Sequence, residues 1–277
     1  MTKLRKQTSA PTLGLALALA AFTPGAFADS PTPAADNSAE LAKKLANPIA
    51  NLISLPIKVD WDTGIGPAEA SATTYVIQPV VPISLNADWN VISRTIIPYV
   101  ERQSPLTGGH GESGLADVTQ SFFFSPKAPT SGGWIWGAGP VLLLPTASNN
   151  AIGSEKWGAG PTAVVLRQDS GWTYGILANH IWSFAGDDDR ADISATFLQP
   201  FLSYTTKTYT TFGINTESTY DWKNEQWTVP INVSVSQLLK FGKQPVSFAL
   251  GARHYVERPS NGPDWGLRFT VTFLFPK

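Results

Sequence analysis

Residues 228–237 read Thr-Val-Pro-Ile-Asn-Val-Ser-Val-Ser-Gln, and the alternation in this stretch decides the fold class. Its apolar side chains recur at every second position, at Val229, Ile231, Val233 and Val235. The polar positions between them are Thr228, Asn232, Ser234 and Ser236. Successive side chains of a β-strand point to opposite faces of the sheet. The stretch therefore predicts a strand with one apolar face and one small, polar face.

The same alternation continues from residue 56 to the end of the chain. Turn signals divide this region into twelve predicted strands. Their predicted bounds are 56–65, 73–85, 89–102, 115–126, 133–145, 156–168, 172–184, 192–205, 208–220, 226–240, 244–257 and 264–275. We therefore predict an all-β fold.

The connections between these strands alternate in length. Short ones lie at 86–88, 169–171, 206–207 and 241–243, whereas long polar ones lie at 103–114, 146–155 and 185–191. Tryptophans gather near predicted strand ends, at Trp61, Trp89, Trp134, Trp157, Trp172, Trp182, Trp227 and Trp265. Short turns at one end, long loops at the other, an even strand number and aromatic girdles are typical of a transmembrane antiparallel up-and-down β-barrel.

A secreted β-sandwich is the alternative, because its strands also alternate between apolar and polar positions. Its polar face normally carries many charges, whereas charged residues make up 15% of this chain.

One feature opposes a closed barrel, namely the prolines inside the predicted strands. They are Pro79, Pro82, Pro98, Pro140, Pro161, Pro200 and Pro230. Each removes a hydrogen-bond donor from the sheet, so we expect bulges or strand ends at these positions.

The N-terminus has the three parts of a secretory signal peptide. Lys3, Arg5 and Lys6 precede an apolar run at 13–22, and residues 26–28 read Ala-Phe-Ala. We predict a signal peptide over 1–28, followed by export to the bacterial outer membrane. Residues 29–55 are predicted to form a linker with a short amphipathic helix at about 39–47, and residues 56–277 the barrel. The helix either packs into the periplasmic mouth as a plug or lies on the inner leaflet of the membrane.

Composition excludes several kinds of chemistry. The chain has no Cys, three His and a net charge of −1. These counts argue against a thiolate site and against broad electrostatic binding of nucleic acid. No spacing of the three His is typical of a metal site. We predict no catalytic residues, no metal and no cofactor.

Charged side chains on the predicted polar faces are candidates for the lumen of the barrel. They are Lys58, Asp60, Asp62, Glu217, Arg253, Glu257 and Arg268. A charge on the lipid face costs roughly 2–4 kcal/mol at mid-bilayer, so these residues are expected to face the lumen. Closure pairs the last strand with the first, which brings Arg268 near Asp60 or Asp62. The ions either brace one another or form a charged constriction that selects solutes.

Several motifs resemble those of a known family. They are NPIANLISLP at 47–56, GPVLLLPTA at 139–147, KWGAGPT at 156–162, NHIWSF at 179–184, WTVP at 227–230, GKQPV at 242–246, GPDW at 262–265 and FLFPK at 273–277. With these the chain resembles the outer-membrane β-barrel family named for the MetA pathway of phenol degradation. The resemblance implies a barrel fold, an outer-membrane location and a channel or transporter role linked to aromatic compounds. It implies no catalytic residues.

From these observations we predict a passive outer-membrane channel or transporter for small molecules, including aromatic or hydrophobic ones. The expected partners are outer-membrane lipid, the solute and, during biogenesis, the barrel-assembly machinery, since the chain ends in an aromatic strand containing Phe269, Phe273 and Phe275. Two alternatives stay open. One is a structural or interaction barrel with a closed lumen, and the other is a barrel enzyme that modifies lipid.

Overall fold

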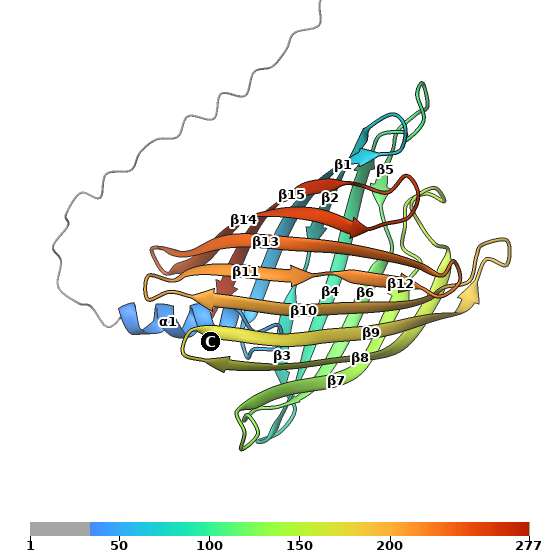
Figure 1. Ribbon diagram of the computed structural model, residues 1–277. Coiled ribbons are helices and arrows are strands. Elements are labelled where there is room, and N and C mark those ends of the chain that lie inside the picture. The colour runs from blue at the N-terminus through green and yellow to red at the C-terminus, as the bar shows by residue number, and fades with distance from the viewer. Residues whose placement is uncertain (1–33, 277) are drawn as a thin grey trace, which may run out of the picture. The chain divides into compact units, whose positions relative to one another are not determined.

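The computed structural model describes residues 34–276, which form one short helix and a β-sheet (Figure 1). The predicted signal peptide lies outside the described residues. The helix is α1 (Ala34–Leu45), and the strands are β1 (Ile53–Ile65), β2 (Ala70–Ile77), β3 (Val80–Ser84), β4 (Trp89–Arg102), β5 (Glu112–Leu115), β6 (Val118–Pro126), β7 (Trp134–Leu144), β8 (Lys156–Asp169), β9 (Trp172–Gly186), β10 (Ser194–Thr205), β11 (Thr210–Thr216), β12 (Ser218–Asp221), β13 (Gln226–Phe241), β14 (Gln244–Glu257) and β15 (Trp265–Phe275).

The strands form a closed antiparallel barrel. β1 pairs with β15 from Ile53↔Phe275 to Thr63↔Trp265, and β9 pairs with β10, so the sheet closes on itself. The predicted strands 73–85 and 208–220 are interrupted, giving β2 and β3, and β11 and β12. The predicted strand 115–126 corresponds to β6, and the short β5 before it lies mostly in the predicted loop 103–114, with a break between the two. When each interrupted pair is counted as one barrel strand, the described residues contain the twelve strands that the sequence predicts. The predicted all-β barrel with a short N-terminal helix is thereby confirmed.

Four of the seven in-strand prolines occupy positions where a missing N–H is tolerated, whereas Pro82, Pro98 and Pro200 lie within paired stretches of β3, β4 and β10. Pro79 lies in the break between β2 and β3, and Pro230 lies at a register shift between β13 and β14. Pro140 and Pro161 face each other on β7 and β8, so two residues without an N–H share one level of the ladder. A closed sheet therefore accommodates these four prolines at a strand break, at a bulge and in an opposed pair.

The connections differ in length at the two ends of the barrel. One end, here called the short-turn end, carries the two-residue turns 170–171 and 242–243 and the chain's described N-terminal residues. The opposite end, called the long-loop end, carries the loops 103–111, 145–155 and 187–193. This is the asymmetry that the sequence predicts for an outer-membrane barrel.

The outer surface of the barrel is apolar between two rows of aromatic rings. Between the rows, Val233 and Leu250 expose 49% and 59% of their surface. At the short-turn end the ring pairs are Trp89–Trp136, Trp134–Tyr174 and Trp172–Tyr204. At the long-loop end they are Trp61–Trp265, His180–Trp182, Tyr220–Trp222 and Tyr220–Trp227. An apolar band between two aromatic girdles matches the profile of a lipid bilayer.

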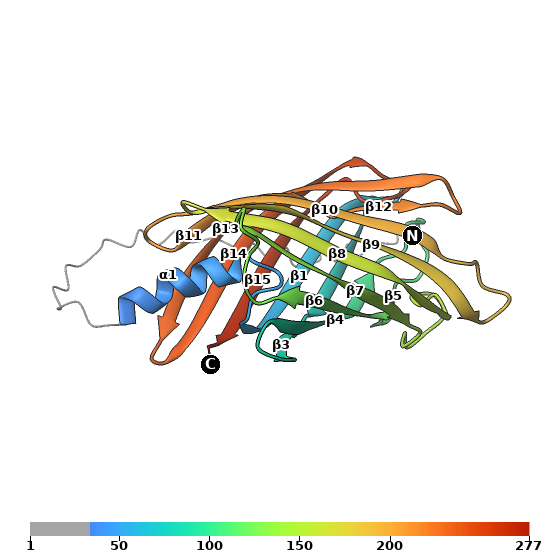
Figure 2. The same cartoon turned by 90° about the horizontal axis from the view of Figure 1, so that it is seen from below.

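Residues 38–52, called here the mouth segment, fill the short-turn end of the barrel (Figure 2). Leu41 and Ala42 of α1 are buried together with Leu238 and Leu274 of the barrel wall. After the helix, Ile49 enters the main apolar core of the lumen, which is formed by Val80, Ile92, Phe123, Val164, Leu166 and Leu177. The mouth segment therefore buries its apolar stripe against the inner wall. Among the described residues no helix is long and apolar enough to cross a bilayer.

The helix differs from its predicted bounds. It begins by Ala34 and ends at Leu45, whereas the pattern of apolar residues predicts about 39–47. Pro48 explains the early end, because a proline disfavours helical geometry in the residue before it. Asn47 then accepts a hydrogen bond from the Ile49 amide at 2.9 Å, which stabilises the turn into the lumen.

The two faces of β13 can be distinguished by labelling. Val233 is half exposed on the outer surface, whereas Ser234 lines the interior. In lipid vesicles we expect a membrane-soluble maleimide to react with Val233→Cys and a small water-soluble maleimide to react with Ser234→Cys. The reversed pattern would show that the register of β13 is shifted by one residue.

Candidate lumenal site

Five charged side chains meet on one wall of the lumen, and barrel closure brings them together. Asp60 of β1 lies directly opposite Arg268 of β15, and Asp62 lies opposite Gly266. On the other side of β15, Arg253 of β14 also lies opposite Gly266. A Cβ at Gly266 would lie 2.3 Å from Asp62 Oδ1, so glycine leaves the space through which Arg253 reaches Asp62. With Glu217 these residues form the lumenal charge cluster (Asp60, Asp62, Glu217, Arg253 and Arg268).

Arg268 is the centre of the lumenal charge cluster. Its Nε and Nη2 donate to the two carboxylate oxygens of Asp60 at 2.5 and 2.8 Å. Its Nη1 and Nη2 donate to the two oxygens of Glu217 at 2.9 Å each. The planar guanidinium is suited to this bidentate geometry, which an ammonium cannot reproduce. One arginine therefore uses both oxygens of two carboxylates.

Arg253 contacts the three carboxylates of the cluster. Its Nη1 lies 3.3 Å from Asp62 Oδ2, and its Nη2 lies 3.2 Å from Asp60 Oδ2. Its Nε donates to Asn232 Oδ1 at 3.1 Å, and its Nη1 donates to the Tyr255 hydroxyl at 3.1 Å. These contacts join β1, β13 and β14 across the wall.

Glu217 reaches the cluster because the ninth barrel strand is interrupted at this residue. It lies between β11 and β12, and the hydroxyls of Thr216 and Ser218 hydrogen-bond to each other beside it. A local interruption of the ladder re-aims a side chain, a role that β-bulges often have near functional sites. Here it directs a carboxylate toward Arg268.

Two of the seven predicted lumenal residues lie outside the cluster. Lys58 is on β1, nearer the short-turn end, and its Nζ donates to Gln78 Oε1 at 2.9 Å. Glu257 is exposed at the last position of β14, with Gln226 Nε2 3.4 Å from its carboxylate. The register shift between Val229 and Pro230, together with the end of the strand, places Glu257 at the long-loop rim, away from the lumenal ions.

Sequence reasoning missed two interior residues, Tyr255 and Arg94, whereas Asn232 lies on the polar face that the alternation of its strand predicts. Arg94 lies in the middle of β4, and its Nε is buried. The rule that assigned the other charges to the lumen applies equally to an arginine in the middle of a membrane strand. Arg94 was therefore detectable from its position. Tyr255 was not, because aromatic residues also occur on the outer faces of these strands.

The long-loop end carries a separate ion pair. Buried Lys156 lies 3.3 Å from the carboxylate of Asp192, and exposed Lys223 lies 3.9 Å from it. Hydrogen bonds from Lys156 and then from Ser183 hold the pKa of Asp192 below its usual range. The pair fixes the loop 187–193 against β8.

No group of His, Cys, Asp or Glu within residues 34–276 has the arrangement of a metal site.

One histidine lies beside hydroxyl groups at the long-loop girdle. Ser194 Oγ is 3.4 Å from His180 Nε2, and Thr196 Oγ1 is 2.7 Å from His180 Nδ1. The ring also packs against Trp182, with 4.0 Å between centroids and 45° between the ring planes. In a hydrolytic triad a carboxylate stabilises the developing imidazolium, and a threonine hydroxyl carries no charge to do so. This arrangement favours an interfacial packing role for His180.

Comparison with known proteins gives a structural match without a sequence match. No protein-family model and no curated protein matches the chain. A crystal structure of the COG4313 outer membrane channel from Pseudomonas putida F1 matches with a TM-score of 0.64 at 16% identity, covering 81% of this chain and 96% of that one. The β-domain of the Bordetella autotransporter BrkA gives a TM-score of 0.45 at 10% identity over 81% of this chain and 100% of that one. The first similarity establishes that the fold is that of an outer-membrane barrel.

The lumenal charge cluster makes a prediction about stability. Arg268→Gln leaves two carboxylates without their bidentate donor, and we expect the free energy of unfolding to fall by roughly 3–5 kcal/mol. The matched control is Arg258→Gln, because Arg258 pairs with Asp264 in an exposed loop. That change should cost less than about 1 kcal/mol. Chemical unfolding in lipid vesicles measures both values, and equal losses would show that the cluster does not brace the barrel.

Proposed function

We propose that this protein is a passive channel of the bacterial outer membrane for small molecules. The observation that carries the proposal is the contrast between the two surfaces of the barrel wall. Outside, apolar side chains form a band between two aromatic girdles. Inside, five charged side chains and a row of serine, asparagine and glutamine residues line the lumen. These polar and charged groups share the interior with the apolar core around Ile49, and a lipid-facing barrel with such an interior has the arrangement of a pore.

The short-turn end corresponds to the periplasmic side in this proposal. Outer-membrane barrels have short periplasmic turns and long external loops. The mouth segment then enters the pore from the periplasm, where it buries Leu41 and Ile49 and leaves Lys43 exposed. Its last turn is held to the wall by a hydrogen bond of 2.8 Å from Gln168 Nε2 to the Lys43 carbonyl. The mouth segment acts as a plug that narrows the channel, as opposed to a helix lying on the inner leaflet.

The sequence resemblance supports a finer assignment, to the barrel family named for the MetA pathway of phenol degradation and to aromatic or hydrophobic solutes. The cavity next to the mouth segment supports a small solute, since it has a volume of about 350 Å³ and includes the aromatic ring of Phe201. Pockets for small molecules start near 300 Å³. Outer-membrane lipid and the barrel-assembly machinery are the partners that this assignment implies.

Two other functions would give different results in conductance and hydrolysis experiments. A structural barrel with a closed lumen conducts no ions even without the mouth segment. A lipid-modifying enzyme hydrolyses phospholipid, and the Ser194–His180 contact is the one observation in its favour. Electrophysiology and a phospholipid hydrolysis assay on the same purified sample distinguish the three functions.

Truncation of the mouth segment tests the proposal. Deleting residues 30–46 removes α1, and deleting residues 30–52 also removes Ile49 and the irregular stretch that follows the helix. We expect single-channel conductance to rise in the first variant and to rise further in the second, because each deletion empties more of the lumen.

The control for truncation is Lys43→Gln, which changes an exposed side chain and leaves the packed stripe intact. Its conductance should equal that of the full chain. Heat-dependent gel mobility reports whether each variant forms a barrel. Unchanged conductance in both folded deletions would contradict the plug, and absence of any conductance would contradict the channel.

A further inference from the structure

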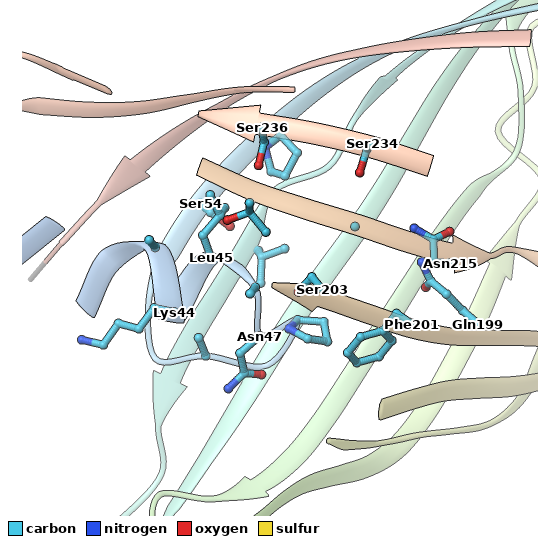
Figure 3. A pocket seen from close by; sticks show the side chains of 18 of the residues that line it. Lys44, Leu45, Asn47, Ser54, Gln199, Phe201, Ser203, Asn215, Ser234 and Ser236 are labelled. Carbon is cyan, nitrogen blue, oxygen red and sulfur yellow. The ribbon is translucent and has the colours of Figure 1, made fainter. Parts of the chain in front are cut away.

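The cavity on the lumenal side of the mouth segment is lined by two cationic side chains, Lys58 and Arg94, that no carboxylate contacts. It is lined by Ala50 and Leu52 of the mouth segment, by Phe201 of β10, and by Lys58 and Arg94 of the wall. Gln199 and Asn215 lie at one end of this space, and Leu45 and Asn47 close the other (Figure 3). The side chain of Lys44 points away from it (Figure 3).

Arg94 is the most unusual of these groups. No hydrogen bond or ion pair joins its guanidinium to any residue of the described chain, and its Nε is buried. Arg253 Nη2 is also buried without a hydrogen bond, but it lies 3.2 Å from a carboxylate oxygen of Asp60. A guanidinium cannot lose its proton at physiological pH, so its desolvation has to be offset by a partner. The described chain supplies none in contact with Arg94.

The neighbouring carboxylates are already occupied. Asp60 and Glu217 each accept two hydrogen bonds from Arg268, and Asp62 pairs with Arg253. Glu217 interacts electrostatically with Lys58 and Arg94 without contacting either. Counted within the described residues, Lys58, Arg94, Arg253 and Arg268 face three carboxylates. These seven side chains therefore carry one net positive charge.

The rest of the lining defines the body of the ligand. Ser203, Ser234, Gln199 and Asn215 offer neutral hydrogen-bonding groups at the wall. Phe201, between Gln199 and Ser203 on β10, offers apolar surface, as do Ala50 and Leu52 of the mouth segment. A bare inorganic anion would leave this apolar surface unused, whereas a cation would be repelled by Lys58 and Arg94. The lining matches a molecule with one negative end and one apolar end.

We propose that this cavity binds a small monocarboxylate with an apolar body, whose carboxylate lies between Arg94 and Lys58. Arginine binds a carboxylate through two parallel hydrogen bonds, and Lys58 adds a second positive charge. This inference rests on the proposed channel and names the class of solute that it holds. The ligand sits on the lumenal side of the mouth segment, so it occupies the path that a solute takes through the barrel.

The test is calorimetric titration of the full-length barrel in lipid nanodiscs, with benzoate as the probe. We expect Arg94→Gln to weaken benzoate binding by at least about tenfold, since a charged hydrogen-bonding partner is lost. Lys58→Gln should also weaken binding. The matched control is Arg102→Gln on the same strand, since Arg102 is exposed at the long-loop end and bonds to the Ala151 carbonyl. It should leave the affinity unchanged.

Two further probes define the ligand class. Benzamide has the same ring and no charge, and acetate has the carboxylate and almost no apolar body, so both should bind more weakly than benzoate. Arg94→Gln removes an unpaired buried cation, and we expect it to fold and to melt no lower than the unmodified barrel in the absence of benzoate. Should it fail to fold, Lys58→Gln provides the same comparison.

Several results would overturn the inference. These are no benzoate binding by the unmodified barrel, equal affinity in Arg94→Gln or Lys58→Gln, benzamide binding as tightly as benzoate, or acetate doing so. The conductance experiment is independent of this one. Conductance without benzoate binding overturns the anion site alone, whereas benzoate binding without conductance in either deletion overturns the channel alone.

Discussion

Pairing between β1 and β15 removes the free edge of the sheet, and the rest of the structure depends on this closure. In lipid, each unpaired backbone N–H or carbonyl costs several kcal/mol, so a sheet can cross a membrane only as a closed barrel. Four of the seven in-strand prolines, which lack that N–H, are accordingly found at a strand break, at a register shift and in an opposed pair. The same closure aligns Asp60 with Arg268, two residues from opposite ends of the chain.

The lumenal charge cluster and the mouth segment divide the interior between them. The cluster occupies one wall, where its two arginines pair with its three carboxylates and Arg268 bonds to both Asp60 and Glu217. The mouth segment fills the short-turn end with apolar side chains, of which Ile49 reaches deepest into the core. Between the two lies the cavity that Arg94 and Lys58 line. A twelve-stranded barrel is wide enough to need such filling, because side chains from the wall alone leave space at its axis.

The arginines of the lumen differ in whether a carboxylate contacts them, and this difference gives them different roles. Arg253 and Arg268 are neutralised by contact, so they strengthen the wall and contribute little attraction for a solute. Arg94 has no contacting carboxylate, and its charge is directed at the cavity in a region of low dielectric constant, where electrostatic interactions are strongest. In the proposed channel, stability and solute selectivity would therefore depend on different arginines of one lumen. Such a channel would discriminate by charge at a site that its structural ion pairs do not occupy.

Strand positions follow from the sequence because alternation is a local property. The predicted bounds of β4 and β14 agree with the structure, as does the outward direction of Val233. Six of the seven ions that local patterns predict for the lumen lie inside the barrel in the structure. Local patterns do not show that the ninth strand breaks at Glu217, that Glu257 lies at the rim, or that Arg94 has no partner. These facts depend on register between residues up to 208 positions apart, as in the Asp60–Arg268 contact, and on the length of the mouth segment inside the lumen. Only closure of the barrel decides which side chains meet.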